Sequence, residues 1–321
     1  MIDPKLLSAK AQEVKDKLAS RSPKLIAEAQ RIIELDAAYK KLLAEVEALR
    51  AQKNEVSKKI GFLRAKEGEQ AAREAMDEAN KIKDAMQKQE EQLAALKEQT
   101  TALLYALPNL PDDSVPPGKD AADNKLIKES AIPKPVFDFE VKDHHDIGEA
   151  LGILDFATAA KLSGSRFALY KGDGAKLERV LAAFMLDLQT RRGYAEHQPP
   201  VIVNADILLG TGQLPKFKED MYRIEGEEDQ YLISTAEIPL TNLYRGQILK
   251  ESDLPKNLTA CTPCFRKEAG TYGKDARGLI RNHQFTKVEL VKIVKPEDSM
   301  PALEQMVTDA EAVLEALNLP Y

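Results

Sequence analysis

The chain has 321 residues, of which 43% are apolar and 31% charged, with a net charge of −6, and this length suits about two domains. The apolar content excludes a wholly disordered chain, and no run approaches the roughly 18 to 20 apolar residues of a membrane-spanning helix. The N-terminus lacks a basic start followed by an apolar run, so we expect no signal peptide. Two cysteines cannot build a disulfide scaffold, which fits the reducing cytoplasm. Composition alone assigns no function.

The first third is expected to be almost entirely helical, because before Pro108 its only glycines are Gly61 and Gly68. Two apolar registers alternate in steps of three and four: Ile32, Leu35, Tyr39, Leu42, Val46, Leu49, Val56, Ile60 and Leu63, then Ala72, Ala75, Ala79, Ile82, Met86, Leu93, Leu96, Leu103 and Leu107. Such heptads predict a left-handed coiled coil. The break between the registers predicts a reversal near 64–71, giving an antiparallel hairpin. A parallel coil between two subunits is the alternative.

The end of this hairpin carries an excess of basic residues. They are Lys53, Lys58, Lys59, Arg64 and Lys66. A projecting arm with a basic end could bind a phosphate backbone through counterion release. A spacer or dimerisation rod would show the same solvated charges, so the residues alone leave both interpretations open.

Six prolines between Pro108 and Pro135 predict a linker. Beyond it, strand-like and helix-like segments alternate, which predicts a mixed α+β body. We expect strands at 136–141, 231–233, 258–266 and 284–294, and helices at 177–191 and 301–317. The last two strands flank a glycine-containing loop, which favours a long-looped antiparallel hairpin.

Chemically capable side chains gather in this last hairpin, at Arg266, Glu268, Lys274, Asp275, Arg277, Arg281, His283, Phe285 and Glu289. Guanidinium groups can each hold two phosphate oxygens, a phenyl ring offers a purine a flat surface, and a carboxylate suits an ammonium group. A solvated hairpin with surface ion pairs is the alternative. The glycine-rich phosphate-loop signatures are absent from the sequence. Cys261 and Cys264 lack the second pair that a structural zinc site needs.

Several segments resemble the seryl-tRNA synthetases of bacterial type, which are class II aminoacyl-tRNA synthetases. The likeness runs from the first residues through KLSGSRFALYKG at 161–172, GYAEHQPP at 193–200 and GQLPKF at 212–217. Its most specific parts are TAEIPLTN at 235–242, TPCFRKEAG at 262–270 and HQFTKVE at 283–289. The resemblance covers essentially the whole chain.

The resemblance implies a role for each matching residue. In the ATP site it implies Arg266, Lys267, Glu268, Arg281 and Phe285, with Arg266 and Arg281 catalytic and Phe285 stacked on the adenine. For the serine site it implies Thr235, Ala236, Glu237 and Glu289. Magnesium would accompany the ATP phosphates, and no metal ligand is assigned. The basic arm residues would contact tRNA, and Pro199 and Pro200 would fall at a homodimer interface.

The implied fold is an N-terminal antiparallel coiled-coil hairpin followed by a class II antiparallel sheet with flanking helices. Residues 1–107 would form the tRNA-binding domain, 108–135 the linker and 136–321 a partial catalytic core. The implied activity is ATP-dependent activation of L-serine and its transfer to tRNA(Ser), and also to tRNA(Sec), in the cytoplasm. The family continues into a third motif beyond the position of Tyr321, so we expect a C-terminally truncated chain, poorly active alone.

Two other functions stay open. One is a catalytically silent tRNA-binding or dimerising protein. The other is a synthetase-like enzyme that loads small amino acids onto carrier proteins, although such enzymes lack the long arm that the heptads predict here.

Overall fold

The computed structural model describes residues 2–268 and 277–321, and the chain divides into two compact units, Met1–Lys125 and Leu126–Tyr321. Among the described residues, none of the helices combines the length and apolar character required to cross a membrane.

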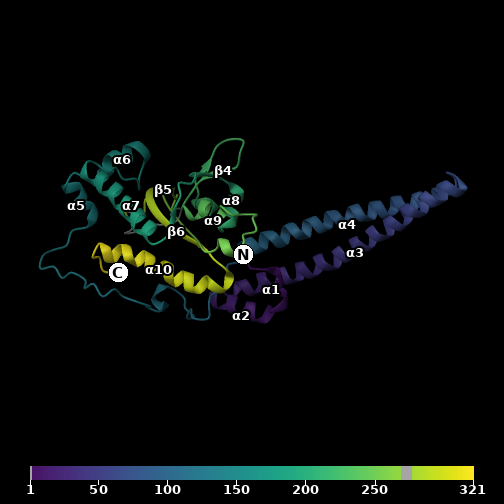
Figure 1. Ribbon diagram of the computed structural model, residues 1–321, viewed down its shortest axis with the longest axis horizontal. Helices are drawn as coiled ribbons and strands as arrows, with labels where there is room; N and C mark the ends of the chain where they lie inside the picture. Colours follow the sequence, from purple (N-terminus) through teal and green to yellow (C-terminus); the bar gives the residue numbers. More distant parts are fainter. Residues whose placement is uncertain (1, 269–276) are drawn as a thin grey trace. The chain divides into compact units, whose positions relative to one another are not determined.

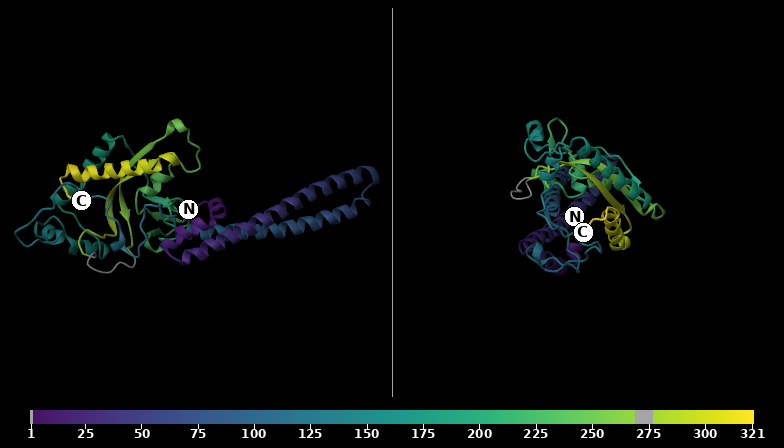
Figure 2. Two further views of the ribbon diagram at one scale, coloured as in Figure 1. Left: turned by 90° about the horizontal axis from the view of Figure 1, so that it is seen from below. Right: turned by 90° about the vertical axis from the view of Figure 1, so that its left-hand side faces the viewer.

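The first unit is dominated by a long helical arm, in which α3 (Lys24–Glu67) and α4 (Arg73–Ala106) run side by side (Figures 1 and 2). The predicted heptad positions are all buried or half-buried, which confirms the coiled-coil prediction. The chain reverses at Gly68, whose φ of 85° lies in the left-handed region that glycine adopts without strain. Arg50 of α3 pairs with Glu90 of α4 at 2.7 Å across the arm. The hairpin is therefore formed within one chain.

The base of the arm is closed by two short helices, α1 (Pro4–Ala9) and α2 (Ala11–Arg21). Asp3 caps α1 by accepting a hydrogen bond from the Lys5 backbone N–H at 2.8 Å. One core joins these helices to the ends of α3 and α4, and consists of Ile2, Leu7, Val14, Leu18, Ala29, Ile32, Leu104 and Leu107. The arm thus has its own packed base.

The second unit is built on the hairpin of β5 (Lys256–Phe265) and β6 (Gln284–Ile293), which pair antiparallel with Leu258 opposite Val291. This confirms the predicted hairpin. The short strand β1 (Ala195–Glu196) joins the other edge of β5 in parallel, so the expected antiparallel sheet, built on β5 and β6, has one short parallel strand at its edge. A second sheet has the order β2 (Ile202–Asn204), β4 (Gln230–Leu232), β3 (Arg223–Ile224).

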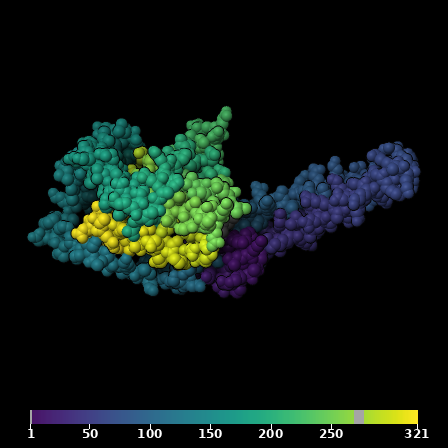
Figure 3. Space-filling model, in the orientation of Figure 1, coloured from purple at the N-terminus to yellow at the C-terminus, as the bar shows by residue number. Residues whose placement is uncertain are grey.

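Helices cover both faces of the β5–β6 hairpin. On one face lie α7 (Asp173–Arg191) and α10 (Ser299–Ala316), close to the predicted helices, and the outer side of α10 is at the surface (Figure 3). On the other face lies α9 (Glu237–Asn242), whose Leu240 packs with Leu258 and Val291. The remaining helices are α5 (His144–Ala150), α6 (Phe156–Ser163) and α8 (Ala205–Gly210), with short 3₁₀ turns at Ala121–Asp123, Lys218–Asp220, Glu251–Asp253 and Pro296–Asp298.

The strand predicted at 136–141 is wrong. The segment is irregular and exposed, with Val136 97% and Phe139 64% exposed. Phe137 packs against Phe139, with 5.1 Å between the ring centroids. An alternating pattern forms a strand only where a neighbouring strand takes up its backbone hydrogen bonds, and no described strand pairs with this segment.

A buried polar cluster centred on Asp309 ties α10 to α7 and β6. The Asp309 residue is 3% exposed. Its carboxylate accepts four hydrogen bonds, from Tyr194 Oη at 2.7 Å, Arg192 Nε at 2.8 Å, Gln305 Nε2 at 3.0 Å and Lys292 Nζ at 3.3 Å. Burial alone would raise the pKa of this carboxyl, but the four donors outweigh that effect and hold the pKa at about 2. Burial, and then the bond to Asp309, raises the pKa of the Tyr194 hydroxyl.

Candidate active site

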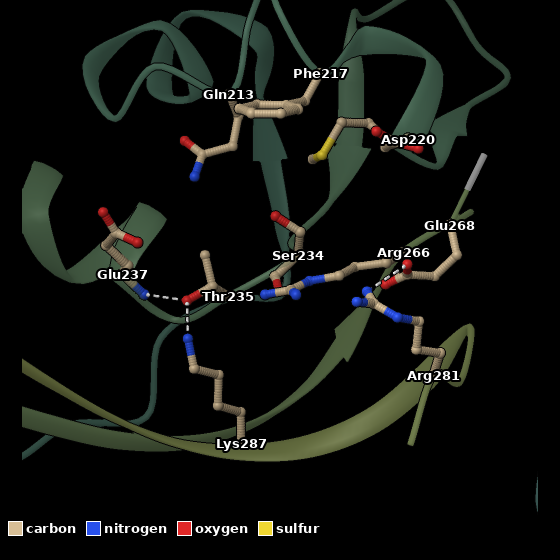
Figure 4. Close-up of a pocket in the computed structure, with 11 residues that line it drawn as sticks. Gln213, Phe217, Asp220, Ser234, Thr235, Glu237, Arg266, Glu268, Arg281 and Lys287 are labelled. Carbon is tan, nitrogen blue, oxygen red and sulfur yellow. Dashed lines mark hydrogen bonds and ion pairs between the residues drawn. The ribbon is translucent and has the colours of Figure 1, made fainter. Parts of the chain in front are cut away.

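A pocket of about 360 Å³ opens on the face of the β5–β6 hairpin that carries α9 (Figure 4). Its lining consists of Gln213, Phe217, Asp220, Met221, Ser234, Thr235, Glu237, Arg266, Glu268, Arg281 and Lys287. Gln213 and Phe217 lie on the opposite side of the pocket from Lys287 (Figure 4). The pocket therefore joins residues from the hairpin, from the turn before α9 and from the segment after α8.

Arg266 follows the last residue of β5, and its backbone and side chain are both fixed. Its N–H donates to the His283 carbonyl at 2.9 Å, and its Nε donates to the Ser234 carbonyl at 3.3 Å. The guanidinium lies 5.1 Å from the centre of the Phe285 ring, within cation–π range. These contacts hold the Arg266 guanidinium in place beside an aromatic ring.

Glu268 and Arg281 form an ion pair at the open end of the hairpin, with 3.3 Å between Arg281 Nη1 and Glu268 Oε2. The Glu268 side chain is 13% exposed and the Arg281 side chain 44% exposed. Glu268 has a φ of 48°, an uncommon conformation for a residue with a side chain. Such strain persists where the surroundings impose it, and functional sites are a common place for it.

The opposite end of the pocket carries a hydroxyl and two carboxylates. The Thr235 hydroxyl donates to Glu289 and accepts from Lys287 Nζ at 3.1 Å. Lys287 Nζ is also 2.5 Å from Glu289 Oε2. Although Glu237 is exposed at the pocket, desolvation by the surrounding protein, and secondly the nearby Glu289, raise the pKa of its carboxyl above the ordinary value of 4.5. This end therefore offers carboxylates and a hydroxyl to a small polar ligand.

The structure brings most of the sequence-predicted residues to this pocket. Phe285 stands beside Arg266 without lining the pocket, and Glu289 reaches it through Thr235 and Lys287. The Lys267 ammonium lies 5.7 Å from the Tyr222 ring and outside the lining. Ala236 is fully buried and packs in the core with Leu240. Lys274 and Asp275 lie outside the described residues.

Sequence reasoning missed a whole wall of the pocket, made by Gln213, Phe217, Asp220 and Met221, as well as Ser234 and Lys287. The backbone carbonyl of Asp220 accepts a hydrogen bond from the Lys267 N–H at 2.9 Å, which ties this wall to the hairpin. In the sequence, the segment 212–217 carries only the resemblance and no site residue is predicted there. The segment mixes polar and aromatic residues after a short helix, and this pattern does not predict which side chains point toward a pocket.

The five basic residues predicted for the arm all lie on α3, away from this pocket in the chain. Lys58, Lys59, Arg64 and Lys66 are exposed, and Lys53 is half-buried. Lys59 and Lys66 are two helical turns apart and share a face. Lys66 also lies over the Phe62 ring at 4.6 Å.

Two family models match the chain. The seryl-tRNA synthetase N-terminal domain matches residues 1–111, and the tRNA synthetase class II core domain (G, H, P, S and T) matches residues 217–321. Among solved structures, the seryl-tRNA synthetase of Pyrococcus horikoshii, complexed with ATP, superposes with a TM-score of 0.90 at 32% identity. That match covers 100% of this chain and 76% of that one.

Curated relatives match over the full chain. A serine–tRNA ligase of Elusimicrobium minutum is 56% identical over 321 residues, which are 100% of this chain and 75% of that protein. A serine–tRNA ligase of Desulforapulum autotrophicum is 48% identical over 322 residues, covering 100% of this chain and 74% of the relative. With this identity over about three quarters of each relative, the chain belongs to the serine–tRNA ligase family of aminoacyl-tRNA ligases.

Proposed function

We propose that this chain binds ATP and L-serine in the pocket on the β5–β6 hairpin, forms seryl-adenylate, and transfers the seryl group to tRNA(Ser). The observation that carries the proposal is the pocket's polarity. Arg281 and Glu268 lie at one end, Thr235, Glu237 and Lys287 lie at the other, and the Arg266 side chain reaches between them. A nucleotide needs cationic groups for its phosphates, and an amino acid needs a carboxylate for its ammonium group. A pocket that offers these at opposite ends would bring the two substrates together in the middle, where the reaction takes place.

In the first half-reaction, a serine carboxylate oxygen would attack the α-phosphorus of ATP in line, and the bond to pyrophosphate would break. Arg266 would hold phosphate oxygens while its opposite side contacts Phe285, whose ring would also support the adenine. Arg281 would stabilise the charge that develops at the α-phosphate. Glu237 and Glu289 would receive the serine ammonium, so the carboxylate points toward the arginines. Catalysis would come from orientation and electrostatics.

In the second half-reaction, a terminal adenosine hydroxyl of the tRNA would take the seryl group and release AMP. We assign tRNA binding to 1–107, the linker to 108–135 and the catalytic core to 136–321. We extend the proposal to tRNA(Sec), since an arm that contacts the backbone reads shape more than base sequence. We place the reaction in the cytoplasm, where translation uses its product.

Magnesium would enter this site with its nucleotide. Among the described residues, the only group of three side chains with metal-ligand spacing is Asp143, His145 and Asp146, near the start of α5 and outside the pocket. Mg²⁺ commonly binds through substrate phosphates with one or two carboxylates and several waters. The pocket carboxylates fit that partial ligand set, and the ion would neutralise phosphate charge.

We also propose a homodimer. Leu177 and Val180 on α7 are 55% and 46% exposed, and Ile202, shortly after Pro199 and Pro200, is 46% exposed. Exposed apolar side chains at these positions favour a partner surface. Light scattering during gel filtration should give twice the chain mass of 35.6 kDa.

Serine-dependent exchange of labelled pyrophosphate into ATP tests the first half-reaction directly. Threonine and alanine serve as control amino acids. Exchange that requires serine would establish adenylation by these 321 residues. No exchange, in a chain that still binds tRNA(Ser), would instead favour the catalytically silent tRNA-binding protein.

Removal of Arg266 is expected to weaken ATP binding by about 10- to 100-fold, because a hydrogen bond to a charged group contributes about 1.5–3 kcal/mol. Isothermal titration of ATP into Arg266→Ala and into wild type measures the change. Arg223→Ala is the matched control, since Arg223 pairs only with the exposed Asp229 among described partners, at 2.8 Å. Equal losses in both variants would contradict the assignment of Arg266 to the phosphates.

Serine binding is expected to weaken as the pH falls from 7 toward the raised pKa of Glu237, because the protonated carboxyl no longer attracts an ammonium group. Glu237→Gln should remove this pH dependence and bind serine about 10- to 100-fold more weakly at pH 7.

Ionisation of a carboxyl with a raised pKa costs folding stability as the pH rises through that pKa. Glu237→Gln should therefore remain fully folded at pH 7. Serine titrations across this pH range would contradict the role of Glu237 if both proteins gave parallel curves.

A further inference from the structure

The open end of the β5–β6 hairpin, which carries Glu268 and Arg281, is held by a residue far earlier in the chain. Arg166 follows α6 and contacts both sides of this end. Its backbone carbonyl accepts the His283 N–H at 2.9 Å, and its Nη1 donates to the Glu268 carbonyl at 3.1 Å. One residue thus bridges the chain leaving β5 and the chain entering β6.

The backbone of Arg166 is itself unusual. Its φ of 61° places it in the left-handed region, as does the φ of 48° at Glu268. Both are residues other than glycine, they are hydrogen-bonded to each other, and they lie at the edge of a pocket. Such a backbone conformation indicates that tertiary contacts impose it. The bond between Arg166 and Glu268 joins these two strained positions directly.

A second contact holds the returning side of the same loop. The Leu279 N–H donates to Nε2 of His144, the first residue of α5, at 2.8 Å. Gly278 has a φ of 75°, and a Cβ there would lie 2.2 Å from His144 Nε2. At Gly278, three residues before Arg281, the backbone therefore approaches the imidazole more closely than a residue with a side chain would allow.

We propose that Arg166 and His144 are positioning residues that fix the ATP-binding end of the hairpin before the nucleotide arrives. The inference deepens the proposed function and rests on it for the identity of the ligand. Neither residue lines the pocket, so each acts through the residue that it holds. Arg166 holds the Glu268 carbonyl, and His144 holds the Leu279 N–H, two residues before Arg281. Preordered residues on the two sides of this end lower the entropy lost on binding, and small misplacements of charged groups are costly.

Hydrogen exchange of the ligand-free chain tests the positioning and does not depend on ATP binding. Arg166→Gly removes the side chain and suits the left-handed backbone, and His144→Ala removes the acceptor. We expect amide exchange at 266–268 and 279–284 to become about tenfold faster in either variant, with β5 unchanged. Unchanged exchange in these two segments would overturn the inference.

Conservative variants separate positioning from general stability. His144→Gln keeps an acceptor near the position of Nε2, and Arg166→Lys keeps the charge and a donor. We expect both to restore most of the wild-type exchange, while Arg223→Ala behaves as wild type. If Arg166→Gly exchanges throughout the unit, Arg166→Gln is measured in its place, with the same criteria. Failure of both conservative variants to restore protection would overturn the inference.

ATP titration then connects the positioning to the ligand. We expect Arg166→Gly and His144→Ala to weaken ATP binding about tenfold with serine binding unchanged, since these residues hold Glu268, His283 and Leu279, none of which is at the serine end of the pocket. If loop exchange changes as expected but wild type binds no ATP, the positioning stands and the proposed function fails. If wild type binds ATP and the variants bind it equally well, the inference is overturned and the proposed function stands.

Discussion

Replacement of Asp309 by alanine is expected to lower the free energy of unfolding of the Leu126–Tyr321 unit by about 3–5 kcal/mol, the usual cost of removing one partner of a buried ion pair. The alanine variant would leave Lys292, whose side chain is 11% exposed, without its carboxylate partner at 3.3 Å. It would also leave the buried Tyr194 hydroxyl without the acceptor it has at 2.7 Å. The segment after α7, β6 and α10 would lose the carboxylate that they share.

The same carboxylate predicts an acid transition. Its pKa of about 2 in the folded chain lies below the ordinary value of 3.8. A depressed carboxyl pKa contributes stability that is present above the unfolded pKa and disappears as the pH falls through the folded one. The contribution of Asp309 should therefore be lost between about pH 4 and pH 2, and Asp309→Asn should be less sensitive to acid in this interval.

Hydrogen exchange of β5 and β6 amides in increasing urea measures this stability, because the helical arm dominates any circular dichroism signal and the chain contains no tryptophan. Asp229→Ala is the matched control. Its ion pair with Arg223 is 53% exposed on the aspartate side, and such pairs contribute about 0–1 kcal/mol. Equal destabilisation by the two variants would contradict a special role for the buried cluster.

Neutralising the basic end of the arm is expected to lower tRNA(Ser) affinity by about 10³-fold near physiological salt. The variant replaces Lys53, Lys58, Lys59, Arg64 and Lys66 by alanine. Each phosphate contact contributes about 0.7–0.9 to the slope of log K against log salt, so the loss of five contacts should reduce that slope by about four. Alanine is a strong helix former, which keeps α3 intact.

A control with the same number of changes uses basic residues nearer the base of α3, namely Lys24, Arg31, Lys40, Lys41 and Arg50. Filter binding over a range of salt concentrations gives both slopes. A large change for the end variant alone would assign the tRNA contact to the end of the arm. Unchanged affinity in both variants would contradict tRNA binding by α3 and favour a spacer or dimerisation rod. Equal losses would contradict a contact confined to the end.

The elements predicted correctly are those whose pattern is local. Each heptad position of α3 and α4 repeats within two helical turns, so the sequence alone reveals the face that is buried. The β5–β6 hairpin was equally clear, because two apolar strands flank one loop and their pairing needs no third element. The failure at 136–141 shows the limit of a local pattern, since alternation cannot say whether a partner strand exists.

The candidate site divides in the same way. The residue types from Arg266 to Glu289 lie on one hairpin, so the sequence by itself determined that two arginines, a phenyl ring and carboxylates would be neighbours. Only the tertiary structure decided which of them line the pocket. Packing turned Ala236 into the core, added a wall from 213–221, and brought Arg166 and His144 to the open end of the hairpin. The bonds of Lys287 to Thr235, Arg166 to Glu268 and His144 to Leu279 join residues 52, 102 and 135 positions apart. Long-range packing, which no local periodicity encodes, determines them.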